Sequence, residues 1–454
     1  MNLLSCFKAY DIRGKVPDDL NEDLAYRIGR AFVEELQAKS VVIGFDIRLE
    51  SPLLAEALIH GVTVAGAQVI NIGLCGTEEV YFGTCHYETD GGIMVTASHN
   101  PKGYNGMKLV ARDAKPISGD TGLQQIHNRV VASFTSGSPL IDINPSGQVT
   151  EAFDKSAYVA HILSYINTKA LKPLKIVMDS GNGSAGIVIR EIAQQLPINA
   201  IYINDTPDGN FPNGVPNPLL PEKRMLTEQA IREHQADFGI AWDGDFDRCF
   251  FFDGSGNFIE GYYVVGLLAE SLLAKNPGAK IIHDPRLTWN TIEQVQQAGG
   301  IAVQSKTGHA FIKERMRLEN ALYGGEMSAH HYFKEFAYCD SGMIPWLLIA
   351  ELASKTGKSL NELVAERMAA FPCSGEINYT VADIQAVLDK LLLFYADQNP
   401  VIDKTDGISM DFVDWRMNIR ASNTEPLLRL NVESRGSMQL VRMKVHQIEQ
   451  LIKS

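Results

Sequence analysis

The sequence lacks a long uninterrupted hydrophobic run. Its longest apolar helix candidate, residues 343–352, contains Pro345 and Glu351 and is too short to span a bilayer. The first residues also lack the apolar core of a secretory signal peptide. We therefore expect a soluble, cytoplasmic protein that does not bind a membrane.

Blocks of positive charge are absent as well. The chain has 41 Lys and Arg against 54 Asp and Glu, which gives a net charge of -13. No stretch is rich enough in Lys and Arg to bind nucleic acid or an anionic membrane surface. We expect no nucleic acid partner, and an anionic substrate would have to be met by local cations.

Cysteine is scarce, and its spacing does not suit a metal site. Several of the six cysteines lie in or beside apolar runs, and none follows a metal-binding spacing: Cys6, Cys75, Cys85, Cys249, Cys339 and Cys373. Reduced thiols are the preferred interpretation, which agrees with the cytosol. The oligomeric state cannot be read from the sequence.

Length and periodicity indicate several domains. A chain of 454 residues corresponds to about three or four domains of usual size. Residues 21–36 and 55–65 have helical periodicity, whereas residues 41–44 and 68–72 are typical of strands. This alternation predicts an α/β layer fold. The segment 137–147 is rich in Ser, Pro and Gly and indicates a first domain boundary.

The alternation of strands and helices continues through two further units and then changes. The strands expected in these units are residues 175–179, 238–242, 249–252 and 280–282, with helices at 262–274 and from Ala310. The last quarter predicts one strand from Gly375, a helix at 383–395, strands at 408–413, 416–421 and 427–433, and a final helix at 438–452. The alternation of Ile408, Met410 and Phe412 suits an antiparallel sheet with one covered face. The predicted fold is three successive α/β domains with mixed sheets, followed by a smaller α+β C-terminal domain.

A serine-containing loop is the first candidate site. The sequence T-A-S-H-N-P at residues 96–101 follows residues 93–95, which are typical of a short buried strand. Pro101, Gly103 and Gly106 then discourage regular structure until residues 107–110. Ser98 is therefore predicted on a loop between two strands, where its alternative role is that of an ordinary turn residue.

A cluster of aspartates is the second candidate site. The sequence D-G-D-F-D-R at residues 243–248 lies between two apolar runs. Asp243, Asp245 and Asp247 would repel one another in a buried setting unless a cation lay among them. Oxygen-only ligands favour Mg²⁺ over zinc. A calcium-binding EF-hand loop is excluded because Arg248 and Gly254 stand where its glycine and its glutamate are required, but a solvated acidic turn stays possible.

The two sites together suggest phosphoryl transfer, but one motif competes with this interpretation. A nucleophilic serine beside Mg²⁺ suits a reaction in which metal and cationic groups spread the charge of the transition state. The sequence G-N-G-S-A-G at residues 181–186 matches G-x-G-x-x-G and has Asp205 at about the spacing of a dinucleotide-binding fold. The alternative is a glycine-rich turn. A dehydrogenase would leave the Ser98 and aspartate motifs unexplained.

Taken together, these motifs resemble those of the α-D-phosphohexomutase family and are closest to its bacterial phosphomannomutases. The resemblance covers essentially the whole chain and also includes A-Y-D-I-R-G at residues 9–14, G-E-M-S-A-H at 325–330 and R-A-S-N-T-E-P at 420–426. It implies four domains, named by the motifs that they carry: a phosphoserine-loop domain at 1–148, a metal-loop domain at 149–252, a sugar-binding-loop domain at 253–370 and a phosphate-binding C-terminal domain at 371–454.

The resemblance also implies a mechanism. A phosphoserine at Ser98 would give its phosphoryl group to a hexose monophosphate, and the bisphosphate would turn over and return the other phosphoryl group. Asp243, Asp245, Asp247 and one phosphoserine oxygen would bind Mg²⁺. Arg248 would add a positive group, with a structural ion pair as its alternative role. The implied cofactors are Mg²⁺ and hexose 1,6-bisphosphate as activator.

The remaining site residues follow from the same resemblance. Arg13, His99 and Lys108 flank the family's serine, and which of them manages the hydroxyl proton stays open. Sugar-hydroxyl contacts would come from Glu326 and Ser328, and the non-reacting phosphate would meet Arg420, Ser422, Asn423 and Thr424. The other expected substrate contacts are Tyr10, Arg286, and Lys306 and His309 at the start of a helix. Without the family, each of these residues would be assigned a structural or surface role.

The expected function is interconversion of mannose 6-phosphate and mannose 1-phosphate. Phosphoglucomutase activity is the alternative within the family. A dinucleotide-dependent dehydrogenase and a non-catalytic sugar-phosphate-binding protein are the alternatives outside it.

Overall fold

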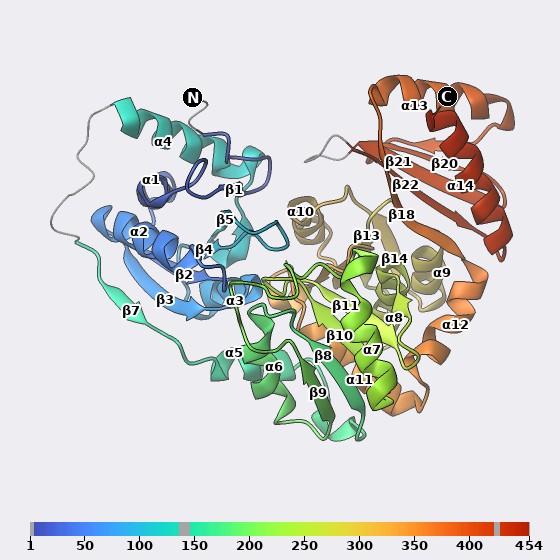
Figure 1. Ribbon diagram of the computed structural model, residues 1–454, viewed down its shortest axis with the longest axis horizontal. Helices are drawn as coiled ribbons and strands as arrows, with labels where there is room; N and C mark the ends of the chain where they lie inside the picture. Colours follow the sequence, from blue (N-terminus) through green and yellow to red (C-terminus); the bar gives the residue numbers. More distant parts are fainter. Residues whose placement is uncertain (1–3, 136–145, 422–426, 454) are drawn as a thin grey trace. The chain divides into compact units, whose positions relative to one another are not determined.

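The computed structural model describes residues 4–135, 146–421 and 427–453 (Figure 1). The chain forms two compact units. The first contains Met1–Phe258 and His330–Gly357, and the second contains Ile259–Ala329 and Lys358–Ser454. The predicted fold class, α/β domains with mixed sheets followed by an α+β domain, is confirmed.

The first sheet of the first unit has the strand order β1-β5-β4-β2-β3-β7, with β6 paired to β5. Strands β2, β3, β4 and β7 run parallel, while β1 and β5 are antiparallel to their neighbours. The strands are β1 Ile12–Lys15, β2 Ser40–Phe45, β3 Gln68–Leu74, β4 Gly91–Val95, β5 Tyr104–Ala111, β6 Lys115–Pro116 and β7 Val149–Glu151. The helices are α1 Glu22–Leu36, α2 Ser51–Val64, α3 Thr77–His86 and α4 Gln124–Thr135.

Both faces of this sheet are buried, and successive side chains of a strand point to opposite faces. Val41 and Ile43 of β2 point to the core shared with α1, α2 and α4, which lie on one side of the sheet in Figure 1. Val42 packs with Val80 of α3 in a separate core on the other face. Because β2 is buried on both faces, its sequence is continuously apolar rather than alternating.

One glycine differs from its predicted role. Gly106 was expected to delay regular structure until Met107, but β5 begins at Tyr104 and includes Gly106. This prediction is wrong because the glycine serves a close approach of two strands. A Cβ atom at Gly106 would lie 2.1 Å from the carbonyl oxygen of Ile12 in β1.

The second sheet has the strand order β12-β11-β10-β8-β9. Its strands are β8 Lys175–Asp179, β9 Asn199–Ile203, β10 Phe238–Trp242, β11 Cys249–Asp253 and β12 Phe258–Ile259, with helices α5 Ser156–Leu163, α6 Ala185–Ala193 and α7 Met225–His234. Strand β10 is parallel to β8 but antiparallel to β11, and Trp242 pairs with Cys249. The aspartate motif is therefore the turn that joins β10 to β11.

A buried glutamate joins three segments of the first unit. Glu78 of α3 accepts hydrogen bonds from the hydroxyls of Tyr158 (2.5 Å) and Ser341 (2.8 Å) and from the amide of Gly342 (2.5 Å). Ser341 and Gly342 follow the antiparallel strands β16 His331–Phe333 and β17 Cys339–Asp340 and precede α11 Ile344–Thr356. These contacts hold α3, α5 and the segment before α11 together.

The second unit begins with a parallel ladder and ends with an antiparallel sheet. Strand β13 Lys280–His283 runs parallel to β14 Ile301–Gln304 and to β15 Tyr323–Gly325. The helices of this part are α8 Gly261–Leu273, α9 Trp289–Gln297, α10 His309–Glu319 and α12 Leu360–Ala370. The last sheet has the order β18-β22-β21-β20-β19, with β18 Cys373–Thr380, β19 Val401–Asp403, β20 Ile408–Asp411, β21 Trp415–Ala421 and β22 Leu427–Ser434.

One face of the last sheet is covered by α13 Ile384–Tyr395 and α14 Met438–Lys453 (Figure 1). Met417 and Ile419 of β21 pack in this core together with Leu428 and Leu430 of β22. Strand alternation therefore turns the residues between them to the opposite face. The predicted antiparallel sheet with one covered face is confirmed.

Two further expectations concern membrane-spanning helices and the state of the cysteines. Within the described ranges, no helix combines the length and the apolar character needed to cross a membrane. All six cysteines are free thiols, as their spacing indicates.

Candidate active site

Ser98 lies on the loop between β4 and β5, as predicted. Its hydroxyl is buried and donates a hydrogen bond of 2.9 Å to Asp243 Oδ2. The backbone of Ser98 has a φ of 49°, a left-handed conformation that residues other than glycine rarely adopt. Such backbone strain persists only where the surroundings hold it, and it often marks a functional position.

Arg248 joins the serine to the aspartate turn. Its Nε donates to Asp243 Oδ2 at 2.8 Å, and its Nη2 donates to Ser98 Oγ at 3.2 Å. The guanidinium group also contacts Nδ1 of His99. Arg248 therefore forms the structural ion pair that was its alternative role. It also places a positive charge at the serine hydroxyl.

Lys108 lies between the other two aspartates. Its Nζ donates to Asp245 Oδ2 at 2.7 Å and to Asp247 Oδ2 at 2.5 Å. Burial disfavours the charged ammonium, but these two carboxylates outweigh burial and raise the pKa of Lys108. Burial raises the pKa of Asp243 to about 6 although Arg248 opposes the shift. The three buried carboxylates of the turn thus lie beside two fixed cations, Lys108 and Arg248.

The three aspartates fit a metal ion. They offer oxygens that lie within 4.8 Å of one another. In the part of the chain that the structure describes, the Oδ1 atoms of Asp243 and Asp245 are buried and have no hydrogen-bond partner, and Oδ1 of Asp247 lies 3.6 Å from Nε2 of His330. Buried anionic oxygens without donors are costly unless a cation meets them, and an all-oxygen ligand set suits a hard cation. The predicted metal-binding cluster is therefore present in the fold.

His99 and Arg13 lie beside the serine loop. Burial, with Arg248 and Arg13 nearby, holds the pKa of His99 well below its usual range, so its imidazole is neutral at neutral pH. Its Nδ1 lies 3.1 Å from Ser98 Oγ. Arg13 Nη1 donates to the carbonyl oxygen of Ala97 at 3.2 Å, and its Nε donates to Asp11 at 2.7 Å. The structure thus places His99 and Arg248 against the Ser98 hydroxyl, Arg13 against the loop that carries Ser98, and Lys108 against the aspartate turn.

Arg48 was not predicted from the sequence, yet it holds the serine loop. Its buried guanidinium donates to four main-chain carbonyls: those of Ser98 (2.8 Å), Asn100 (2.6 Å), Pro101 (3.1 Å) and Tyr104 (2.9 Å). A planar guanidinium with five fixed donors can make such a set of contacts, whereas a lysine cannot. Arg48 therefore defines the path of the loop that presents the serine.

Asp46 supports the same loop from the end of β2. Its carboxylate accepts hydrogen bonds from the hydroxyls of Thr96 (2.7 Å) and Ser51 (2.6 Å) and from the amide of Arg48 (3.0 Å). A signal for these residues existed in the sequence. Asp46 and Arg48 directly follow a buried parallel strand, and the carboxyl ends of such strands are where ligand sites form in α/β sheets.

The predicted sugar-binding residues come together in the second unit. Glu326 is buried rather than on the surface, and its Oε1 accepts from the amide of Gly308 at 2.9 Å. Gly308 precedes α10, so the predicted helix start at this point is confirmed. Arg286 is also buried, and its Nη2 donates to Ser328 Oγ at 3.2 Å and to Asp284 Oδ2 at 2.7 Å.

The other predicted substrate residues lie near the ends of helices and strands or outside them. His309 is the first residue of α10, and Lys306 is exposed shortly before it. Arg420 ends close to Glu376, with 3.3 Å between Nη2 and Oε2. Tyr10, in the first unit, lies in the bend that precedes β1. Ser422, Asn423 and Thr424 lie outside the described residues.

Four family models match the chain in order. They are described as α/β/α domains I, II and III and the C-terminal domain of phosphoglucomutase/phosphomannomutase, and they match residues 5–135, 156–256, 260–371 and 374–450. The chain belongs to the phosphoglucomutase/phosphomannomutase family. The resemblance to the phosphohexomutases is thereby confirmed, as is the expectation of an enzyme.

Individual relatives agree with this family. The chain is 60% identical over 99% of its own length and of a protein named phosphohexose mutases from Xanthomonas campestris pv. campestris. It is 57% identical to the phosphomannomutase of Escherichia coli strain K12, with full coverage of both chains. A solved phosphoglucomutase/phosphomannomutase family protein from Burkholderia thailandensis matches with a TM-score of 0.87 and 31% identity, covering 99% of this chain and 97% of that one.

Packing explains the glycine motif that suggested a dinucleotide site. A Cβ atom at Gly183 would lie 2.9 Å from the carbonyl oxygen of Gly244 in the aspartate turn, and one at Gly186 would lie 1.8 Å from that of Asp205. The amide of Ser184 also donates to the Gly244 carbonyl at 3.3 Å. Gly183 therefore lets the backbone approach the aspartate turn and Gly186 lets it approach Asp205, which favours the glycine-rich turn over the dinucleotide site.

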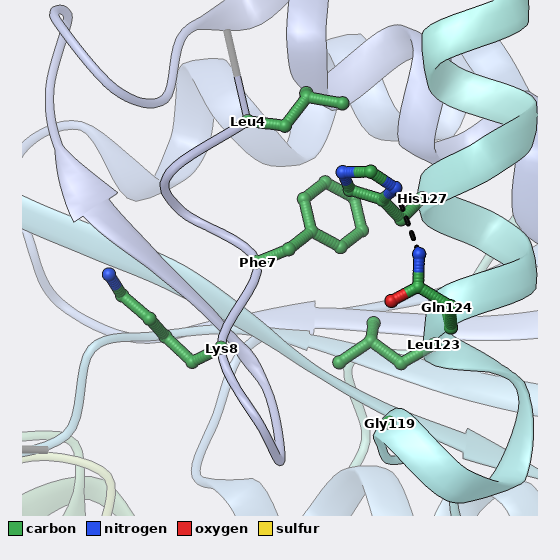
Figure 2. A pocket seen from close by; sticks show the side chains of 7 residues that line it. All are labelled: Leu4, Phe7, Lys8, Gly119, Leu123, Gln124 and His127. Atoms are coloured by element: carbon green, nitrogen blue, oxygen red, sulfur yellow. Dashed lines mark hydrogen bonds between the residues drawn. The ribbon is translucent and has the colours of Figure 1, made fainter. Parts of the chain in front are cut away.

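A small pocket of about 120 Å³ lies elsewhere in the first unit (Figure 2). In Figure 2, Gln124 and His127 of α4 face the segment that carries Leu4, Phe7 and Lys8. The rings of Phe7 and His127 meet edge to face, with 5.1 Å between centroids. None of the described residues that line this pocket carries a carboxylate, so these residues lack the chemistry that Ser98 and the aspartates provide.

We expect Arg48→Lys to lower kcat by about 10- to 100-fold while KM for the sugar phosphate changes little. A lysine ammonium cannot hold four carbonyls, and small displacements of a reacting group have costs of this size. Steady-state kinetics and the melting temperature of the variant would measure the effect. Arg112→Lys is the control because Arg112 is exposed and pairs only with Asp90 among the contacts described for it. An unchanged kcat in Arg48→Lys would contradict a positioning role.

Proposed function

We propose that the chain is a phosphomannomutase that interconverts mannose 6-phosphate and mannose 1-phosphate through a phosphoserine at Ser98. The observation that carries the proposal is the contact of the Ser98 hydroxyl with Asp243 and Arg248, within a cluster that fits a metal ion. The curated relatives named phosphomannomutase support the choice of mannose. The cofactor would be Mg²⁺, with hexose 1,6-bisphosphate as activator.

The aspartate turn would supply the electrostatics of transfer. Asp243, Asp245 and Asp247, with one phosphoserine oxygen, would hold Mg²⁺, which neutralises charge on the phosphoryl group. Arg248 already reaches the serine hydroxyl and would donate to the phosphoryl oxygens. Lys108 would remain protonated between Asp245 and Asp247, because both carboxylates favour its charge.

The transfer step conserves the phosphoryl group. The bond between Ser98 Oγ and phosphorus breaks, a hydroxyl oxygen of the hexose monophosphate forms the new bond, and the hydroxyl proton ends on Ser98 Oγ. The bisphosphate then presents its other phosphate to the serine, and the reverse step releases the isomer. His99, Arg13 and Lys108 are the groups predicted to assist the proton, and of these His99 has a ring nitrogen 3.1 Å from Ser98 Oγ.

The second unit would hold the sugar phosphate. Glu326 would accept hydrogen bonds from sugar hydroxyls, and the Ser328 hydroxyl would donate or accept them. Arg420 would meet the non-reacting phosphate together with Ser422, Asn423 and Thr424, and Arg286, Lys306 and His309 would be further contacts of the sugar phosphate. Tyr10 stays a predicted substrate contact, and the division into domains at 1–148, 149–252, 253–370 and 371–454 stays a prediction.

A coupled assay tests this function. We expect turnover of mannose 1-phosphate in Mg²⁺ with a trace of bisphosphate, and measurable turnover of glucose 1-phosphate in parallel. Glu326 and Ser328 are the sugar-hydroxyl contacts that we assign, and the resemblance places such contacts at ring positions that mannose and glucose share. A preference for mannose beyond about 10⁴ would show that another group recognises the second carbon. A preference for glucose would favour phosphoglucomutase, and no turnover of either would favour a non-catalytic binder.

A further inference from the structure

One carboxylate in the second unit is shared by three arginines. Glu376 Oε2 lies 3.4 Å from Arg286 Nη1 and 3.3 Å from Arg420 Nη2, and Glu376 Oε1 lies 3.2 Å from Arg429 Nη1. Arg286 and Arg420 are buried, and Glu376 and Arg429 are partly buried. Arg429 and Glu376 were not among the residues expected from the sequence.

Strand pairing forces this arrangement. Arg420 of β21 and Arg429 of β22 are direct partners in the ladder, and both lie on the face of the sheet opposite the helices. Like charges placed directly opposite one another across two strands are destabilising. Glu376 of β18 pairs with Asn431, two residues further along β22, and therefore faces the same side. It supplies the anion that this pair of arginines requires.

The contacts of Glu376 are looser than those of a dedicated ion pair. Charge-assisted hydrogen bonds between nitrogen and oxygen usually measure about 2.7–2.9 Å. Arg286 makes such a bond to Asp284 at 2.7 Å, but its distance to Glu376 is 3.4 Å. Two carboxylate oxygens cannot meet three guanidinium groups in bidentate geometry. A phosphate, with its three terminal oxygens, suits such a cluster better.

Glu376 is nevertheless held as an anion. Burial alone would raise its pKa, but Arg286, Arg420 and Arg429 outweigh burial and lower it. Burial and the nearby Arg286 lower the pKa of Arg420, while Glu376 opposes that shift. The carboxylate and the guanidinium groups therefore stabilise one another's charges.

We propose that Glu376 is a resident anion that competes with the substrate phosphate for Arg286, Arg420 and Arg429. This inference rests on the proposed function, in which the bisphosphate must be held and then released so that it can turn around. Glu376 lets the arginines exchange one anion for another, so release of the phosphate leaves an anion beside buried Arg420 and partly buried Arg429, while Arg286 keeps its bond to Asp284. Its effect is to weaken binding and to speed exchange.

The test is Glu376→Gln, which keeps the shape of the side chain and removes its charge. We expect KM for mannose 1-phosphate to fall by about 10-fold and kcat to fall by several-fold, because phosphate binds more tightly and leaves more slowly. Calorimetry with mannose 1-phosphate in a Ser98→Ala background should show the tighter binding without turnover. Glu376→Asp, which keeps an anion, should lower KM less than Glu376→Gln does.

Inorganic phosphate gives a readout that does not depend on activity. It should raise the melting temperature of Glu376→Gln more than that of the parent enzyme, because a ligand that binds the folded state stabilises it in proportion to its affinity. Glu449→Gln is the control. Glu449 pairs with Lys453 on α14, and the substitution removes the same charge from the same domain. This control should leave KM, kcat and the phosphate response unchanged.

The possible failures can be told apart. A parent enzyme that turns over hexose phosphates, combined with weaker or unchanged binding in Glu376→Gln, would overturn the role of Glu376 and leave the proposed function standing. Weaker binding in that variant would mean that Glu376 orients the arginines for phosphate instead of competing with it. A parent enzyme that neither binds nor converts hexose phosphates would overturn both the proposed function and this inference.

Discussion

Ser98→Ala should abolish turnover at every concentration of hexose 1,6-bisphosphate. The substitution removes the oxygen that carries the phosphoryl group, together with the hydroxyl contacts to Asp243 and Arg248. Losing a positioned nucleophile and its charge-stabilised transition state is worth on the order of several kcal/mol, or several decades in rate. We expect the fold to survive, because serine and alanine differ by one oxygen atom.

The phosphoryl group itself can be measured. Intact mass should show part of the purified wild-type protein heavier by one phosphoryl group, located on the peptide that contains His99 and Asn100. Enzyme that has been dephosphorylated should be inactive and recover when a trace of bisphosphate is added, whereas Ser98→Ala should not recover. Ser156→Ala, an exposed serine at the start of α5, should behave as wild type. Activity in Ser98→Ala, or phosphate found only on another residue, would refute the phosphoserine mechanism.

Asp245→Asn should reduce kcat by at least about 100-fold while the protein stays folded. The change removes one of three anionic ligands from the cluster that fits a metal. It also weakens the bond from Lys108 and the hydroxyl contact of Thr77, which meet the same oxygen at 2.7 and 2.6 Å. Both effects act on the electrostatics around the serine hydroxyl.

Kinetics as a function of Mg²⁺ concentration would measure this loss, and the stabilisation of the protein by Mg²⁺ would provide a second readout. Mg²⁺ should raise the melting temperature of the wild-type protein and have a smaller effect on Asp245→Asn. Asp237→Asn is the control because Asp237 is exposed and caps the start of β8 through the amide of Lys175. Normal turnover of Asp245→Asn at limiting Mg²⁺ would contradict the assignment of the aspartates as metal ligands.

The sequence by itself determined the local elements and the two central motifs. Residues 175–179 and 238–242 are the strands β8 and β10 within the bounds expected from their apolar runs. The serine loop and the aspartate turn were readable because each follows a buried strand directly, and because three adjacent carboxylates carry their own electrostatic argument. The G-x-G-x-x-G motif could not be judged in this way, since only packing against Gly244 and Asp205 gives its glycines their role.

Tertiary structure alone decided which distant charges meet. Lys108 reaches Asp245 and Asp247 across more than a hundred residues, and Arg48 holds the carbonyls of a loop about fifty residues away. Glu376, Arg420 and Arg429 share a sheet face only because of the register between β18, β22 and β21. Periodicity shows whether a side chain is buried but not which partner it meets there, because ion pairs in a core depend on strand order and register.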